Sequence, residues 1–164
     1  MLFRSGQAEK AGKIHPYTLD LASLLGLTLG ALGEHQQAQQ LLNDTITRSR
    51  RILGEDHPET LRTASLLGLT LGALDEHQRA RQLQTDALTR LRRVLGDDHP
   101  ETLTSASRLA ADLRELGEYQ RAHTLDQDTL ARRHRVLGND HPDTLISAYN
   151  LAADLHALGE HEQT

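Results

Sequence analysis

The sequence contains no cysteine and no tryptophan, and only one phenylalanine and three tyrosines. Without cysteine there are no disulfide bonds, thiol nucleophiles or thiolate metal sites. No apolar run approaches the roughly 18 residues that suggest a membrane span, and no signal-peptide centre begins the chain, so we expect a cytoplasmic protein with no membrane partner. The net charge of -5 argues against a nucleic-acid binder.

Proline is also scarce, and its spacing is regular. Each proline lies in a phrase that begins His-Pro and ends Thr-Leu. The residue strings 22–32 and 64–74 are identical. A period of this length indicates a repeat array, in which each unit buries its apolar face against its neighbours. The prolines lie 42 residues apart, at Pro16, Pro58, Pro100 and Pro142.

Each repeat is predicted to form two helices, as residues 54–95 illustrate. Asp56 is a candidate N-cap, Glu59 would complete a capping box, and Pro58 suits a first helical turn. The first helix should break at Leu-Asp-Glu in 74–76, and in the other repeats at Leu-Gly-Glu, including 158–160. The second helix should end before a glycine, with an inward stripe of Ala80, Leu83, Ala87, Leu91 and Val94.

These patterns predict an all-α fold, a right-handed superhelical array of about seven helices in antiparallel hairpins, that is, an α-solenoid. A propeller would need short alternating strands, which this composition does not favour. A HEAT-type array of helix pairs stays open as an alternative. Because aromatic residues are few, the core should pack Leu on Ala, with close helix contacts at Ala38, Ala80 and Ala122. As one domain, the chain divides into a frayed segment 1–11, repeats 12–53, 54–95 and 96–137, and a partial repeat 138–164.

Two phrases carry a resemblance to a known family. Gly-Glu-Tyr-Gln-Arg-Ala at 117–122 resembles the turn of the tetratricopeptide helix hairpin. Leu-Gly-Asp-Asp-His-Pro-Glu-Thr-Leu at 95–103 and Asn-Leu-Ala-Ala-Asp-Leu at 150–155 resemble the kinesin-light-chain type, whose 42-residue units occur in many bacterial regulatory proteins. The resemblance covers nearly the whole chain. It implies a non-catalytic scaffold without cofactors. Such a scaffold would bind a protein or peptide partner, through an extended or helical segment of that partner, in a concave groove.

Histidine and arginine also recur with the repeat. Histidines before each first helix would lie on the order of 10 Å apart in stacked repeats, too far to share a zinc ion, so we interpret them as caps or packing residues and expect no metal. Arginine clusters at 48–51, 90–93 and 132–135 are followed by acidic residues, which favours local neutralisation over binding to nucleic-acid phosphates. No Ser, His and Asp set recurs at a catalytic spacing, so we expect no enzyme.

The candidate site is the inner wall that first helices present in the resembled family. Its first half is apolar and its second half offers guanidinium and amide groups. We therefore expect a ligand with apolar anchors and a carboxylate, with Arg108 and Arg114 exposed to receive it. The resemblance assigns peptide binding to Leu24, Leu27, Arg62, Ser65, Leu66, Leu69, Ser107, Arg108, Ala111, Arg114, Tyr149, Asn150, Ala153 and His156.

A second interpretation is a structural or self-assembly module, or the sensor or adaptor part of a larger signalling ATPase or transcriptional regulator. The sequence stops just inside the second helix of the fourth repeat. Leu145, Ala148, Ala152 and Leu155 would then face water, because solenoids need polar outer faces on their terminal repeats. We therefore expect self-association through the terminal repeats, or a longer parent chain.

Overall fold

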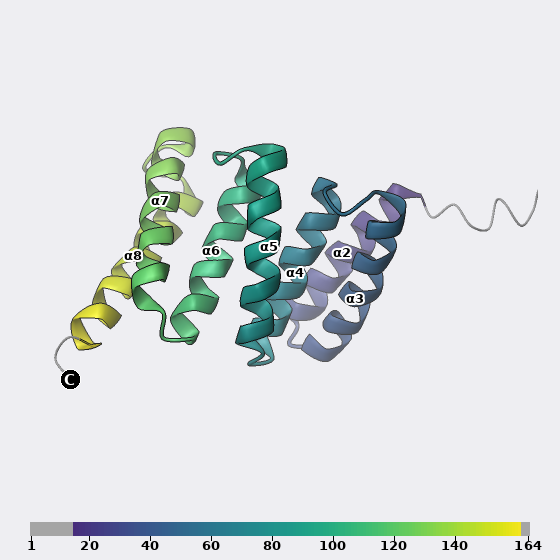
Figure 1. The fold of residues 1–164 in the computed structure, drawn as a ribbon, viewed down its shortest axis with the longest axis horizontal. Helices are drawn as coiled ribbons and strands as arrows, with labels where there is room; N and C mark the ends of the chain where they lie inside the picture. The colour runs from purple at the N-terminus through teal and green to yellow at the C-terminus, as the bar shows by residue number, and fades with distance from the viewer. Residues whose placement is uncertain (1–14, 162–164) are drawn as a thin grey trace, which may run out of the picture.

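The structure is a computed structural model that describes residues 15–161, and every regular element in that range is a helix. The helices lie side by side in chain order, with α8 at the left and α2 and α3 at the right of Figure 1. Their bounds are α2 Pro16–Ala31, α3 His35–Ile52, α4 Pro58–Ala73, α5 His77–Leu95, α6 Pro100–Glu115, α7 Tyr119–Leu137 and α8 Pro142–His161. The predicted all-α solenoid is confirmed, whereas the predicted fraying of 1–11 lies outside the described residues.

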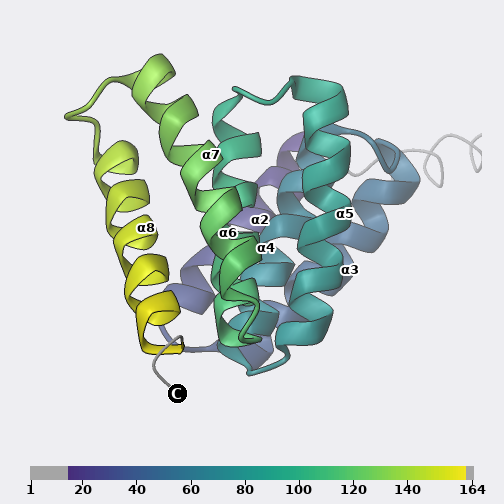
Figure 2. The same cartoon turned by 60° about the vertical axis from the view of Figure 1, so that its left-hand side comes forward.

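The first helices of the repeats, α2, α4, α6 and α8, lie on the inner side of the array. Each helix packs against the next along the chain, and α4 also contacts α2 and α6. Within residues 15–161 the second helices α3, α5 and α7 make no comparable contacts with one another. The first helices α2, α4 and α6 therefore approach one another more closely than the second helices do, which puts these three on the concave side. Figure 2 shows α8 standing beside α7 at one end of this array.

Each first helix is capped by histidine and not by the predicted capping box. Pro58 lies in the first turn as expected, but Nδ1 of His57 accepts the hydrogen bond from the backbone N–H of Glu59, at 3.2 Å. Asp56 lies one residue too early to serve as the N-cap. The structural interpretation of the loop histidines is thus confirmed. Equivalent bonds are made by His15, His99 and His141.

The first helices of the three complete pairs end in a left-handed residue. Gly33 and Gly117 take φ values of 81° and 75°, and Asp75 takes 60° at the equivalent place. The predicted break at 158–160 is wrong, because α8 continues to His161. After α2, α4 and α6 the chain turns back, and a second helix packs on the first. Within the described residues no second helix follows α8, so no packing contact there requires the helix to end at 158–160.

The core packs leucine on alanine, as predicted. All buried hydrophobic residues of the described chain are Leu, Ala or Ile, and Ala38, Ala80 and Ala122 are completely buried. The predicted inward stripe is buried at Ala80, Ala87 and Leu91 and partly buried at Leu83, whereas Val94 is 40% exposed. Toward α7 and α8 the interior becomes charged. It buries Asp112, Asp126, Arg133 and Asp154.

Candidate functional site

Two adjoining hollows mark the inner side of the array. The first, here called the apolar hollow, lies between α2 and α4 and encloses about 290 Å³. The second, the polar hollow, lies among α4, α6 and α8 and encloses about 660 Å³. Leu69 and Ala73 line both, so the two hollows form one continuous surface.

The apolar hollow is built from glycines and leucines. Leu27 and Leu69 are 42% and 44% exposed and present their side chains to it, whereas Leu66 is buried at its floor. A Cβ built on Gly26 would lie 2.6 Å from Leu42, so glycine there allows α2 and α3 to approach closely. A partner side chain entering this hollow would meet an almost wholly apolar surface.

The polar hollow brings together residues from five helices. Its α6 wall changes character along the helix, from Ser107 and Arg108 in the middle to Asp112 and Glu115 near the end. The remaining lining comes from α4, its turn, α5, α7 and α8. It includes Asp75, His77, Gln84, Arg133, Asp143 and Ile146, and α6 adds Thr104 and Ala111 to its own wall.

The predicted site residues divide into three groups in space. Six of them, Leu27, Leu66, Leu69, Ser107, Arg108 and Ala111, line the two hollows. Ser65 lies beneath them, buried and hydrogen-bonded to Gln84 and Arg108. The rest, Leu24, Arg62, Arg114, Tyr149, Asn150, Ala153 and His156, line neither hollow, and Arg62 lines a separate pocket with Asp20 and Glu59.

The expectation that Arg114 is exposed to receive a ligand is wrong. Its Nη1 donates to Asp126 Oδ2 at 2.8 Å and to Asp154 Oδ1 at 2.9 Å, and both carboxylates are completely buried. Burying two carboxylates without a cation costs folding free energy. The Arg114 guanidinium therefore stabilises this buried pair and is not free to receive a ligand. Burial, together with repulsion from Asp154, raises the pKa of Asp126 to about 7, although Arg114 opposes the rise.

Arg108 is also less exposed than expected, for a different reason. Its Nη1 donates to Ser65 Oγ at 2.9 Å, and no carboxylate of the described residues lies within salt-bridge distance. Burial lowers the pKa of Arg108, and the more distant Glu101 only partly offsets this. The side chain lines the polar hollow without an ionic partner.

The acidic end of the polar hollow and the contribution of α7 were not predicted from the sequence. Asp112 is buried, and its Oδ1 lies 3.7 Å from His77 Nδ1. Burial raises the pKa of Asp112 to about 6, against the opposing effect of His77. Arg133 reaches the hollow from a second helix, which a search restricted to first helices cannot find. The available signal was that Arg133 stands 42 residues after the core residue Leu91.

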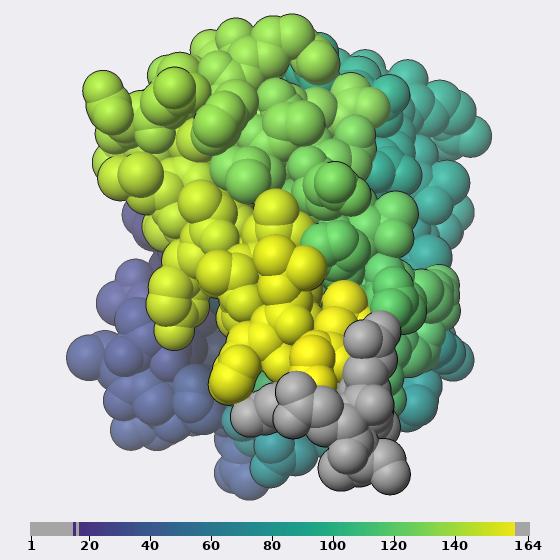
Figure 3. Space-filling view, turned by 90° about the vertical axis from the view of Figure 1, so that its left-hand side faces the viewer, coloured from purple at the N-terminus to yellow at the C-terminus, as the bar shows by residue number. Residues whose placement is uncertain are grey.

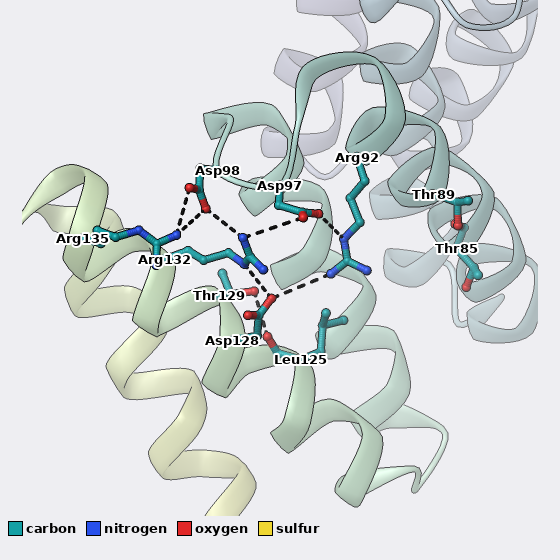
Figure 4. Close-up of polar contacts among 10 residues, drawn as sticks. All are labelled: Thr85, Thr89, Arg92, Asp97, Asp98, Leu125, Asp128, Thr129, Arg132 and Arg135. Carbon is teal, nitrogen blue, oxygen red and sulfur yellow. Dashed lines mark hydrogen bonds and ion pairs between the residues drawn. The ribbon is translucent and has the colours of Figure 1, made fainter.

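The predicted local neutralisation holds for most arginines of the clusters at 90–93 and 132–135, whereas Arg50 and Arg51 of the first cluster make no ion pair within residues 15–161. In Figure 4, Arg132 joins Asp98 and Asp128, at 2.9 Å each, and Arg135 joins Asp98 at 2.8 Å. Arg92 of the preceding repeat reaches Asp128 at 3.9 Å, which links consecutive second helices.

Family comparisons agree with this architecture. Two models, each described as tetratricopeptide repeat, match residues 17–92 and 102–143. The chain belongs to the tetratricopeptide repeat family. Members of this family are generally non-catalytic scaffolds for protein interactions, and the fold described above is that of a repeat scaffold. No curated protein matches this sequence.

Solved structures place the chain near kinesin light chains. It is 26% identical to the nearly identical TPR-like repeats of a protein assigned as a kinesin light chain from Podosopora anserina, with a TM-score of 0.84 over 92% of this chain and 72% of that one. BtubC (BKLC) from P. vanneervenii is 20% identical, with a TM-score of 0.80 over 92% of this chain and 61% of the other. The first likeness supports the kinesin-light-chain type, and the second shows the fold.

Two negative findings hold for residues 15–161. None of their helices has the length and apolar character needed to cross a membrane. In the same range, no group of three or more His, Cys, Asp or Glu side chains is placed to hold a metal ion.

Proposed function

We propose that this tetratricopeptide repeat protein binds a segment of a partner protein along the continuous surface formed by the apolar and polar hollows. The observation that carries the proposal is that Leu69 lines both hollows and is 44% exposed, although internal helices of a solenoid normally bury their leucines. A segment lying across α2, α4 and α6 would cover Leu27 and Leu69, each leucine contributing about 1 kcal/mol or more of binding free energy.

A selection experiment with matched variants tests this mode of binding. Twelve-residue peptides displayed on phage would be selected on the wild-type protein and then measured against Leu69→Asp. The control is Val136→Asp, because Val136 on α7 is 45% exposed and lies outside both hollows. We expect Leu69→Asp to weaken the selected peptides at least about tenfold and Val136→Asp to leave them unchanged. Equal binding by both variants, or no selected peptide at all, would refute the proposal.

Self-assembly is a second candidate, supported by the exposed apolar side chains of the terminal helices. On α8, Leu145 is 57% exposed, whereas its equivalents Leu61 and Leu103 are buried beneath second helices. Ala148, Ala152 and Leu155 are exposed as well, as predicted. Figure 3 looks onto this end, where α8 lies open beside α7. We propose that this face pairs with α8 of a second copy, and the test is given in the Discussion.

A further inference from the structure

Two arginines of the third repeat stand where the second repeat has core leucines. Arg108 lies 42 residues after Leu66, and Arg133 lies 42 residues after Leu91. Both leucines are buried, at 5% and 1% exposure. Leucine satisfies the packing of this fold at both positions, so packing alone does not explain why arginine is present in the third repeat.

Among residues 15–161, neither arginine has a carboxylate within salt-bridge distance, although Asp143 and Asp126 act on Arg133 from farther away. Arg133 is buried, and its Nη1 donates to the backbone carbonyl of Asp143 at 3.1 Å and to Ser147 Oγ at 2.7 Å. Arg108 donates to Ser65 Oγ. Apart from the exposed Arg50 and Arg51, every other arginine among residues 15–161 pairs with at least one carboxylate.

The two arginines also meet at one place. Both line the polar hollow, together with Thr104 and Ser107, and the Oγ of Ser107 is buried without a hydrogen-bond partner among residues 15–161. Burial lowers the pKa of both guanidinium groups, whereas the paired Arg114 has a raised pKa. Two desolvated cations and an unused hydroxyl group facing one hollow form a surface that an anion would complete.

The carboxylates of the polar hollow set the direction of a bound segment. Glu115 and Asp112 lie on the later part of α6, and Glu115 is about 10 Å along the helix axis from Arg108. Asp112 faces His77, and the Asp143 carbonyl faces Arg133. Asp75 and Asp143 line the hollow as well, so the place most favourable to a negative group is the middle of α6, where Arg108 and Arg133 lie.

We propose that Arg108, Arg133 and Ser107 form a subsite for a carboxylate carried by an Asp or Glu side chain of the partner segment. The inference rests on the proposed function, because the carboxylate arrives on a segment whose apolar side chains occupy the neighbouring apolar hollow. In the bound state each guanidinium gains the charge-assisted hydrogen bonds that the free protein does not provide.

The test uses two fluorescein-labelled twelve-residue peptides that differ only in charge. Both carry two leucines at the end meant for the apolar hollow, and the other end has three glutamates in one peptide and three glutamines in the other. We expect the glutamate peptide to bind the wild-type protein about tenfold more tightly by fluorescence anisotropy in 50 mM salt, with most of the difference lost in 500 mM salt. This comparison requires no variant of the protein.

Replacing each arginine by the leucine of the second repeat tests whether the carboxylate binds at Arg108 and Arg133. Arg108→Leu and Arg133→Leu should bind both peptides equally, and each should melt at a temperature no lower than that of the wild-type protein, because an unpaired buried charge is replaced by a side chain that the fold accepts. The control is Arg50→Leu, an exposed arginine of α3 without an ion pair, which should retain the discrimination.

Each remaining outcome has a definite meaning. Equal binding of both peptides to the wild-type protein would overturn the subsite while leaving the groove as a binding surface. Failure of both peptides to bind would overturn the proposed groove and the subsite with it. Discrimination retained in both leucine variants would place the anion elsewhere and refute the assignment.

Discussion

At the scale of single residues, Asp75 stands at a position where the backbone conformation favours glycine. It takes a left-handed conformation, with φ of 60°, at the end of α4, where α2 and α6 have glycine. Left-handed φ values cost non-glycine residues energy, although aspartate tolerates them better than most. We expect Asp75→Gly to raise the free energy of unfolding by about 1 kcal/mol, because its contact with His77 spans 3.7 Å at an exposed side chain and contributes little.

Guanidinium unfolding of Asp75→Gly, measured beside the reciprocal Gly117→Asp, checks this prediction. Gly117→Asp should lower the free energy of unfolding, since Gly117 has φ of 75° in open space. A shift of both midpoints in the same direction would contradict the explanation.

The buried carboxyl of Asp126 should make stability depend on pH. The pKa of Asp126 rises from 3.8 to about 7 on folding, through burial and the nearby Asp154 carboxylate. Between these values the folded chain binds more protons than the unfolded chain, so the free energy of unfolding decreases as pH rises from about 4 to about 7. Asp112 adds a decrease of the same sign up to about pH 6.

Asp126→Asn should remove most of this dependence. The amide can donate to Asp154 Oδ2, which has no hydrogen-bond partner among the described residues, while Arg114 keeps one carboxylate. We expect the variant to exceed the wild-type free energy of unfolding by about 1 kcal/mol at pH 8, with a smaller difference at pH 5. Unfolding curves at both pH values measure this, and a variant less stable than the wild type at pH 8 would disprove it.

At the scale of elements, each first helix depends on its histidine cap. Nδ1 of His99 accepts from the backbone N–H of Glu101 at 3.2 Å, at the start of an internal helix. His99→Ala leaves that N–H unsatisfied and should cost about 1 kcal/mol of stability, whereas His99→Asn should recover most of it, because asparagine is a good N-cap. Thermal unfolding of the two variants decides the matter; equal losses in both would show that the imidazole acts through packing instead.

At the scale of the whole molecule, the open face of α8 should control association. Leu145→Glu places a charge in the middle of the exposed apolar surface without disturbing a buried contact. If copies pair through α8, sedimentation across a wide concentration range should show the wild-type protein associating and Leu145→Glu remaining monomeric. The control is Leu32→Glu, since Leu32 is 72% exposed at the end of α2. A wild-type protein that stays monomeric throughout would refute self-assembly.

The repeat determined much of this protein from sequence alone. The 42-residue spacing of proline, the helix stops and the apolar stripes were enough for the helix order and the Leu-on-Ala core, because each repeat folds by local rules and packs mainly against its neighbours. The first helices that line the two hollows were predicted for the same reason. Asp56 was predicted as the N-cap in place of His57, because residue spacing does not fix the start of a helix to a single residue.

Tertiary structure decided which charged groups are available. Arg108 and Arg114 lie six residues apart on α6, and the sequence pattern does not distinguish their roles. In the structure, Asp126 of α7 and Asp154 of α8 bind only Arg114. Arg133 joins the groove from α7 because the groove extends below the first helices to the second. Partnership between charges depends on distances across elements, which a repeat pattern does not contain, so the ionic character of the groove followed from packing.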